Sequence, residues 1–328
     1  MFNGKHILVT GGTGSFGRTF IRTVLKRYRP ARLIVFSRDE LKQFEMQQEF
    51  SDDCMRYFLG DIRDLSRMMM AMNGVDYVVH AAALKQVPAL EYNPGEAVET
   101  NIRGSQNVAM AALEKGVSKV IALSTDKAAA PVNLYGATKL VADKLFIAAN
   151  NIRGANKIEF SVVRYGNVIG SRGSVIPFFQ KLLAEGATEL PITDPAMTRF
   201  WITLPQSVDF VLNCFERMQG GETFIPKIPS MRIVDLAKAM APDMALKNVG
   251  VRPGEKLHEV LCPADLSLQT LEFSDHYVVE PTFSFTHKPD YSMNCRNEKG
   301  TYVTPGFEYN SLNNTNFLSK QELKKLIA

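Results

Sequence analysis

Apolar residues in the first half of the chain form short continuous runs that alternate with stretches in which apolar positions recur every three or four residues. The runs lie at 5–10, 32–37, 56–59, 76–80, 119–124 and 159–164. Such runs are typical of parallel strands buried on both faces. The periodic stretches predict helices at 15–28, 39–50, 65–72, 94–115 and 134–150. The alternation predicts an α/β fold with a Rossmann-type doubly wound parallel sheet.

The second half is less regular. Its periodic stretches predict helices at 174–185, 205–218 and 233–241, separated by loops that contain Pro and Gly. We expect a Rossmann domain over 1–170, to which a segment near 200–228 returns, and a smaller C-terminal domain over 171–328. From about Pro281 the pattern predicts no definite elements.

Composition excludes several classes of protein. The 328 residues are 45% hydrophobic and 22% charged, which is typical of a globular protein and not of a disordered one. The net charge of +4 includes no run of five like charges, so we expect no nucleic-acid or membrane partner. Four separated cysteines without a CxxC pair predict no metal site. With no signal peptide or apolar span, the expected location is cytoplasmic.

A glycine-rich loop follows the first predicted strand and precedes the first predicted helix. Gly11, Gly14 and Gly17 give the spacing GxxGxxG. In this position bare backbone can approach a pyrophosphate, and the helix N-terminus favours its negative charge. We therefore expect a dinucleotide here, in contact with residues of one short segment: Gly11, Thr13, Gly14, Ser15, Phe16 and Gly17.

The end of the second predicted strand bears on the choice of cofactor. An acidic residue there would bind the adenosine ribose of NAD, but this chain has Ser37, Arg38 and Lys42. These residues can donate to a 2′-phosphate, which favours NADP. Asp39 and Glu40 follow at once, and they can equally belong to the first turn of the next helix.

Small or short residues end the third and fourth predicted strands. They would lie at the carboxyl edge of the sheet, against the adenine and the dinucleotide backbone, or simply pack there. The residues concerned are Asp61, Ile62, Ala81 and Ala82.

A tyrosine and a lysine four residues apart lie on a predicted helix after the fifth strand. Tyr135 and Lys139 therefore share one helix face, and Thr125 stands upstream at a strand end. A tyrosine that takes a proton from an alcohol at neutral pH must lose about three units from its usual pKa of roughly 10. A nearby ammonium and a positively charged nicotinamide can supply that shift.

These motifs resemble the extended short-chain dehydrogenase/reductase superfamily. The TDK triplet at 125–127, YGNV at 165–168, MTRFW at 197–201 and RPGEKLHE at 252–259 are similar, more narrowly, to the UDP-N-acetylglucosamine 4,6-dehydratases. Within that family, the likeness is to the inverting, C5-epimerising enzymes that open pseudaminic acid biosynthesis. It extends from about residue 4 to the C-terminus.

The resemblance implies a hydro-lyase with a tightly bound NADP that is recycled in each turnover and contacts Val168. Tyr135 would act in the oxidation of C4, and Asp126 and Lys127 in the elimination of water across C5 and C6. Lys127 stands where related dehydratases carry Glu. Our hypothesis is that Lys127 removes the C5 proton, which requires its pKa to fall from about 10.4 towards neutrality. Alternatively, Lys127 is only the ion partner of Asp126.

The substrate implied by the resemblance, UDP-N-acetylglucosamine, needs cations and hydrogen-bonding groups. Arg199 and Arg252 suit its diphosphate, and Glu255 would accept from the uridine ribose hydroxyls. The resemblance adds further contacts to the sugar, the phosphate and the nucleotide: Lys85, Asn167, Arg172 and Val175.

The likeness also implies a homo-oligomer, a dimer or a hexamer, and a product that is used for flagellin glycosylation. Three other functions stay open: a dehydratase that retains C5, a C4 epimerase and a non-catalytic NADP-sensing protein. The epimerase needs no Asp126–Lys127 pair, and a sensor needs no Thr125, Tyr135 and Lys139 together.

Overall fold

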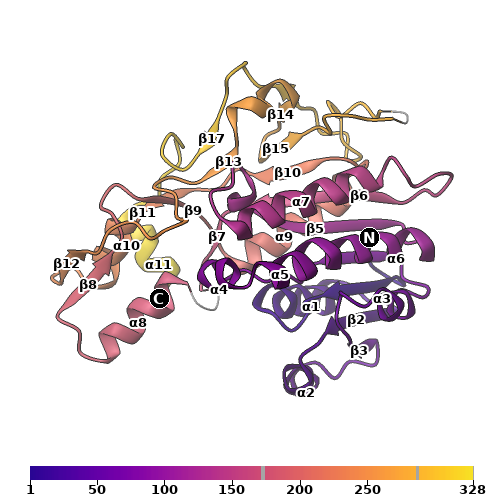
Figure 1. Cartoon of the computed structure of the whole chain (residues 1–328), viewed down its shortest axis with the longest axis horizontal. Coiled ribbons are helices and arrows are strands. Elements are labelled where there is room, and N and C mark those ends of the chain that lie inside the picture. Colours follow the sequence, from indigo (N-terminus) through magenta and orange to yellow (C-terminus); the bar gives the residue numbers. More distant parts are fainter. Residues whose placement is uncertain (171–173, 286–287, 328) are drawn as a thin grey trace.

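The centre of the molecule is a ten-stranded sheet (Figure 1). The computed structural model describes residues 1–170, 174–285 and 288–327. In spatial order, the strands are β16 (Thr301–Tyr302), β14 (Thr270–Glu272), β15 (His276–Val279), β10 (Thr223–Pro226), β6 (Glu159–Tyr165), β5 (Lys119–Thr125), β4 (Tyr77–His80), β1 (His6–Thr10), β2 (Arg32–Ser37) and β3 (Met55–Leu59).

The strands from β10 to β3 pair in parallel and confirm the predicted doubly wound sheet. Their apolar runs are buried on both faces, as in β1, where Ile7, Leu8 and Val9 have no exposed surface. Chain order reverses between β1 and β4. In an open α/β sheet, such a point leaves a crevice at the carboxyl ends of the strands.

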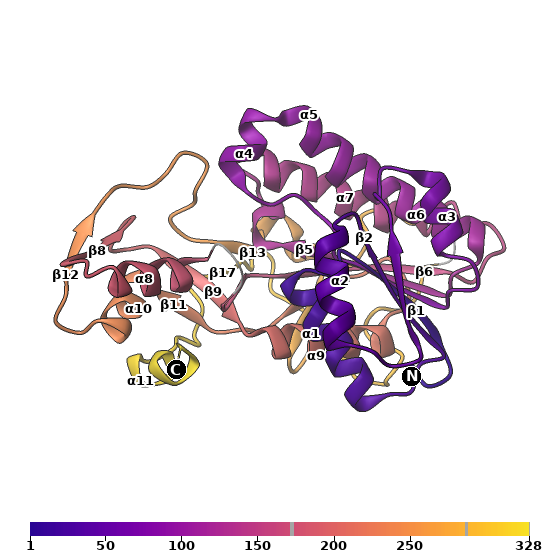
Figure 2. The same ribbon diagram turned by 90° about the horizontal axis from the view of Figure 1, so that it is seen from below.

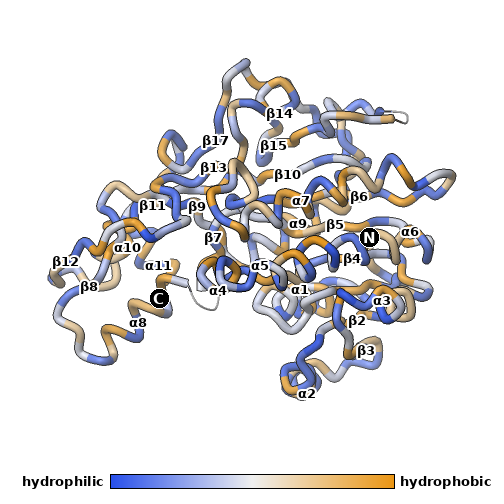
Figure 3. The backbone as a smooth tube through the Cα atoms, in the orientation of Figure 1, coloured by the Kyte–Doolittle hydropathy of each residue, from blue (hydrophilic) through white to orange (hydrophobic). Residues whose placement is uncertain are grey.

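Helices cover both faces of the sheet (Figure 2). On one side lie α1 (Ser15–Arg27), α2 (Glu40–Glu49) and α9 (Leu204–Arg217), and on the other lie α3 (Leu65–Ala71), α6 (Gly104–Lys115) and α7 (Leu134–Ala149). Phe20 and Phe215 fill the first core, and Val108 and Phe146 the second. Figure 3 shows hydrophobic residues along α7, and they pack towards the sheet.

The predicted helix over 94–115 is interrupted. It begins as α5 (Pro94–Ala97), passes through a π-helical turn over Val98–Arg103 and continues as α6. A further short helix, α4 (Val87–Tyr92), was not predicted. Among the helices of the described residues, none has the length and apolarity to cross a membrane.

Segments from the second half of the chain return to the large sheet. β10 adds to β6 in parallel, and β15, β14 and β16 follow it in antiparallel pairing. The return therefore includes residues beyond 200–228. After Pro281, where the sequence predicted no definite elements, the structure has β16, β17 (Tyr309–Asn310) and α11 (Lys320–Ile327).

A smaller lobe packs beside the carboxyl edge of the sheet (Figure 1). Its elements are α8 (Val175–Ala184), β8 (Glu189–Ile192), β9 (Thr198–Ile202), β11 (Ser230–Arg232), α10 (Ile233–Met240), β12 (Ala245–Asn248) and α11. Phe179, Trp201, Leu236 and Leu323 form its separate core. Two short strands, β7 (Asn167–Val168) and β13 (Val260–Cys262), lie between this lobe and the sheet.

Candidate active site

The glycine-rich loop joins β1 to α1 and lies close to the end of β4. Gly11 has φ +65°, and a Cβ added there would lie 2.8 Å from the backbone nitrogen of Ala82. A Cβ on Gly17 would lie 2.3 Å from the carbonyl oxygen of Gly12. Gly14 caps α1 without a side-chain hydrogen bond. The first N–H groups of this 13-residue helix can therefore bind an anionic group.

The residues expected at the adenosine end surround the first turn of α2. Ser37 Oγ lies 3.0 Å from Thr13 Oγ1. Asp39 is the N-cap of α2, and its side chain accepts from the Lys42 backbone N–H at 3.0 Å. Of the two possibilities that the sequence left open for this acid, the structure shows the one in which it caps the helix. The Lys42 ammonium pairs with Asp39, and Arg38 Nη1 lies 3.6 Å from Asp61 Oδ2. Both cations are exposed enough to reach a ligand.

The ends of β3 and β4 are arranged differently from each other. Ala81 and Ala82 donate their backbone N–H groups to Thr10 Oγ1 at 3.2 and 3.3 Å, which fixes the end of β4 against the glycine-rich loop. Asp61 pairs with Arg38, whereas the Ile62 side chain is 5% exposed and packs in the core. Any contact of Ile62 with a ligand must therefore come from its backbone.

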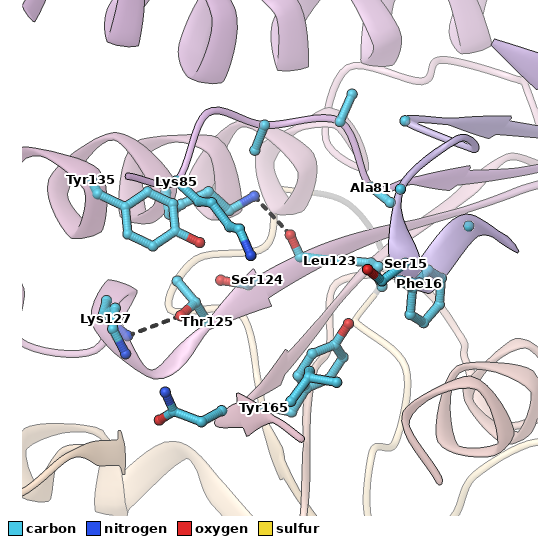
Figure 4. Close-up of a pocket in the computed structure, with 18 of the residues that line it drawn as sticks. Ser15, Phe16, Ala81, Lys85, Leu123, Ser124, Thr125, Lys127, Tyr135 and Tyr165 are labelled. Carbon is cyan, nitrogen blue, oxygen red and sulfur yellow. Dashed lines mark hydrogen bonds between the residues drawn. The ribbon is translucent and has the colours of Figure 1, made fainter. Parts of the chain in front are cut away.

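A cavity of about 580 Å³ runs along the carboxyl edge of the sheet. It brings together many of the residues expected from the sequence: Gly11, Thr13, Gly14, Ser15, Phe16, Gly17, Lys42, Ala81, Ala82, Lys85, Thr125, Asp126, Lys127, Tyr135, Lys139, Asn167 and Val168. Figure 4 shows Ser15 and Phe16 at one end of the cavity and Tyr135, Thr125 and Lys127 at the other. The glycine-rich loop and the expected catalytic residues thus line one continuous space.

Tyr135 and Lys139 lie in the first turns of α7, whose N-cap is Asn133. Lys139 is 4% exposed and donates from Nζ to the Leu123 carbonyl oxygen at 2.7 Å, and burial lowers its pKa. Burial raises the pKa of Tyr135 to about 12, although the Lys127 ammonium acts in the opposite direction. With this pKa, the phenol is protonated at neutral pH.

Lys127 lies between two carboxylates. Its Nζ is 2.9 Å from Asp126 Oδ1 and 3.3 Å from Glu259 Oε1. Burial opposes the charged form, but the two carboxylates outweigh burial and raise the pKa of Lys127. The fall in this pKa that the base hypothesis required is therefore not seen, because the sequence did not reveal Glu259 as a second ion partner.

A second cavity of about 170 Å³ adjoins the first, and Lys127 and Asn167 line both. Arg199, Arg252 and Glu255 line only the second. Arg252 is exposed and lies 3.8 Å from Glu255, whereas Arg199 is largely buried and lies 3.6 Å from Glu259.

One expected substrate contact, Val175, does not line either cavity. Val175 begins α8 and packs onto the core of the smaller lobe. Arg172 lies outside the described residues.

Sequence reasoning assigned no role to Glu259, which is 2% exposed and faces the second cavity. Its only sequence signal was its place at the end of the RPGEKLHE segment. Sequence reasoning also missed a buried network between α7 and the sheet. In it, Asp143 Oδ2 of α7 accepts from Ser124 Oγ of β5 at 2.7 Å and from Arg164 Nη2 of β6 at 3.1 Å.

Comparison with known proteins identifies the family of this chain. Residues 7–281 match the family model described as "Polysaccharide biosynthesis protein". The chain belongs to this family. A family member from Campylobacter jejuni subsp. jejuni named UDP-N-acetylglucosamine 4,6-dehydratase (inverting) is 58% identical over 328 residues, which cover 100% of this chain and 98% of that protein.

Two further relatives span most or all of the chain. The X-ray structure of Pen from Bacillus thuringiensis superposes with a TM-score of 0.89 at 39% identity and covers 100% of this chain and 98% of that one. A protein of Rickettsia canadensis named UDP-glucose 4-epimerase is 43% identical over 288 residues, or 84% of this chain and 83% of that protein.

Proposed function

We propose that this protein is a UDP-N-acetylglucosamine 4,6-dehydratase that inverts C5. Its product would be UDP-2-acetamido-2,6-dideoxy-β-L-arabino-hex-4-ulose. The full-length likeness to the Campylobacter dehydratase supports the substrate and the reaction class. The observation that carries the proposal is the placement of the Asp126–Lys127 pair and Tyr135 in one cavity with the glycine-rich loop. An acid–base pair beside a tyrosine suits an alcohol oxidation followed by elimination of water.

The cofactor side fits a nicotinamide dinucleotide, and we infer NADP. A Cβ at Gly11 or Gly17 would collide with backbone, so glycine lets the loop pack closely against the end of β4, and the N-terminus of α1 offers free N–H groups to a pyrophosphate. Ser37, Arg38 and Lys42 are proposed to bind the 2′-phosphate: Lys42 lines the cavity, and the Ser37 hydroxyl contacts Thr13, which also lines it. When bound in this cavity, NADP would supply a hydride acceptor for C4 and the hydride returned to C6, so that it would be recycled within each turnover.

The NADP assignment has a direct test. The change Arg38→Ala is expected to weaken NADP binding by about tenfold, the loss of roughly 1.4 kcal/mol of charge-assisted contact, and to leave NAD binding unchanged. Titration calorimetry of both cofactors measures the ratio. Equal weakening of NAD and NADP would contradict the assignment.

Tyr135 takes the C4 hydroxyl proton in the proposed first step. Because burial raises the pKa of Tyr135 to about 12, this step requires positive charge beside the phenol, and the Lys127 ammonium acts in that direction. Lys139 lies one helical turn away, and its Nζ is fixed by the Leu123 carbonyl oxygen. Thr125 ends β5 beside the phenol and donates to Asp126 Oδ1 at 2.8 Å.

Asp126 and Lys127 carry the proposed elimination. A proton passes from Lys127 Nζ to Asp126 Oδ1 across their 2.9 Å contact, which leaves a neutral amine and a carboxylic acid. The amine takes the C5 proton, the electron pair of that bond forms the C5–C6 double bond, and Asp126 protonates the departing C6 hydroxyl. Water leaves and the ion pair is restored. A proton from solvent then adds to C5 from the opposite face and inverts that centre.

The side chains that line the second cavity suit the binding of a nucleoside diphosphate sugar. Arg199 and Arg252 are proposed to bind the diphosphate, Glu255 the uridine ribose, and Lys85 and Asn167 the sugar and its phosphate. Asn167 Oδ1 is buried and accepts no hydrogen bond from the described residues, so it is available to a substrate hydroxyl.

The same proposal assigns residues 1–170, with a return near 200–228, to cofactor binding and 171–328 to the sugar nucleotide. Val175, at the start of α8, is proposed to belong to the segment covering the nucleotide. From the family resemblance alone, we infer a cytoplasmic homo-oligomer, a dimer or hexamer, that starts pseudaminic acid biosynthesis for flagellin glycosylation.

A single incubation separates this function from its alternatives. With UDP-N-acetylglucosamine, we expect a product that has lost water, shown by mass spectrometry, and that gives a 4-keto chromophore in alkali, without accumulation of NADPH. A product of unchanged mass would instead indicate a C4 epimerase, which the likeness to the Rickettsia protein makes the second candidate. No conversion at all would favour an NADP-sensing protein.

A further inference from the structure

Four charged side chains meet at the wall between the two cavities: Asp126, Lys127, Arg199 and Glu259. Lys127 Nζ lies 3.3 Å from Glu259 Oε1, and Arg199 Nε lies 3.6 Å from the same oxygen. Glu259 therefore connects the lysine proposed for elimination to an arginine proposed for diphosphate binding. The two carboxylates and two cations balance in charge.

The four side chains differ in access to the cavities. Lys127 is 26% exposed, whereas Asp126 is 1% and Glu259 3% exposed. Lys127 is thus placed to exchange a proton with a bound sugar, and Glu259 contacts Lys127 from a more deeply buried position. A carboxylate this deeply buried is strongly unfavourable unless cations and hydrogen bonds compensate for it.

Glu259 is held in place by the backbone on which it sits. Its N–H donates to Ser311 Oγ at 2.9 Å, and its carbonyl oxygen accepts from the Ser311 N–H at 2.8 Å. Ser311 is fully buried and follows β17, which pairs with β13 directly after Glu259. The carboxylate therefore occupies a fixed position, unlike a surface ion pair between flexible side chains.

We propose that Glu259 is a positioning residue for the elimination: it fixes the Lys127 amine at the cavity wall and stabilises the ammonium that forms when the amine takes the C5 proton. The inference rests on the proposed function, in which Lys127 is the base. The second oxygen of Glu259, Oε2, is buried without a hydrogen-bond partner among the described residues. This oxygen therefore has acceptor capacity left for the Lys127 ammonium.

Other charged groups also act on Lys127, and a pH profile reports all of them. They come from its own turn, from α7, from β9 and from the loop before β13: Asp126, Tyr135, Arg199, Lys256 and Glu259. Only Asp126 and Glu259 are anions that pair with Lys127 Nζ among these groups. Removal of the Glu259 charge must therefore lower the pKa of Lys127.

The test compares Glu259→Gln with Glu255→Gln, the same change on the same loop. For Glu259→Gln, we expect kcat to fall at least about tenfold with KM within about twofold, and the ionisation of the base in the kcat–pH profile to move to lower pH. For Glu255→Gln, we expect a higher KM and an unmoved profile. Thermal unfolding and cofactor content show whether each variant is folded.

Glu259→Asp keeps the negative charge but shortens the side chain by a methylene, which moves the carboxylate away from Lys127. We therefore expect a partial loss of kcat and a pH profile close to that of the wild type. It also decides the test if Glu259→Gln does not fold. Wild-type kcat and profile in a folded Glu259→Gln, or a Glu259→Asp profile displaced to lower pH, would overturn the proposal. A wild-type protein that forms no dehydrated product would instead overturn the proposed function.

Discussion

The cofactor side and the substrate side of the active-site cavity are built in different ways. On the cofactor side, one short segment from Gly11 to Gly17 presents backbone to the cavity, and close packing leaves no space for a Cβ. On the substrate side, charged side chains come from the turn after β5, from β9 and from the loop before β13, and several of them pair with one another. The first side is defined by backbone shape, and the second by side-chain charge.

This difference predicts different effects of substitutions on the two sides. A change at a closely packed glycine of the cofactor side should remove the cofactor and affect folding, because the backbone itself must shift. A change on the substrate side should leave the fold intact and alter KM or kcat alone. Residues between the two sides, such as Tyr135 and Lys127, should affect the chemical step without loss of either ligand.

The largest expected effect belongs to the tyrosine at the junction of the two sides. Tyr135→Phe removes the proposed base of the oxidation and should lower kcat by about 10²–10⁴-fold, with cofactor still bound. Formation of the 4-keto product measures the rate. Tyr92→Phe is the matched control, because Tyr92 is 87% exposed. A Tyr135→Phe enzyme with near wild-type kcat would remove Tyr135 from the mechanism.

Gly11→Ala probes the backbone of the cofactor side. The new Cβ would lie 2.8 Å from the Ala82 nitrogen at φ +65°, so we expect loss of bound cofactor and a fall in the free energy of unfolding. Gly306→Ala is the control, because Gly306 has φ +82° but nothing within 4 Å of a Cβ. That control should show only the cost of the positive φ, about 1–2 kcal/mol. Thermal unfolding and cofactor content measure both; equal effects in the two variants would contradict the close approach.

Arg252→Ala probes the substrate side. Loss of a charge-assisted contact to a diphosphate, worth about 1.5–3 kcal/mol, should raise KM about 10- to 100-fold and leave kcat and thermal stability unchanged. Arg103→Ala, at an arginine that is 68% exposed, is the control. If kcat falls while KM holds, Arg252 serves the chemical step and the division between the two sides is wrong.

The smallest expected effect concerns the sheet beneath both sides. Burial raises the pKa of Glu222 to about 7, although Ser161 Oγ donates to it at 2.6 Å. The folded state therefore keeps this proton to higher pH than the unfolded state, and the contribution of Glu222 to stability falls as the pH rises from about 4.5 to about 7. In Glu222→Gln, the decline in melting temperature over that range should be smaller by a few degrees, whereas Glu185→Gln, at an exposed position, should follow the wild type. An unchanged decline in Glu222→Gln would show that Glu222 does not titrate there.

The sequence predicted the parts of the molecule that local pattern determines. The parallel strands from β1 to β6 and the Gly11–Gly17 loop follow from continuous apolar runs and from glycine spacing. The elements β16 and β17 are two residues long, and both residues of β16 are exposed, so they carry no periodicity to detect. The pairing of Lys127 with Glu259 depends on β13 and β17, which meet only in the folded chain.

We propose above that this protein removes water from UDP-N-acetylglucosamine and inverts C5. Nuclear magnetic resonance of the first product formed in deuterated water distinguishes inversion from retention. We expect a 6-deoxy-4-keto sugar of L-arabino configuration with deuterium at C5. A first product of D-xylo configuration would contradict inversion and identify a dehydratase that retains C5.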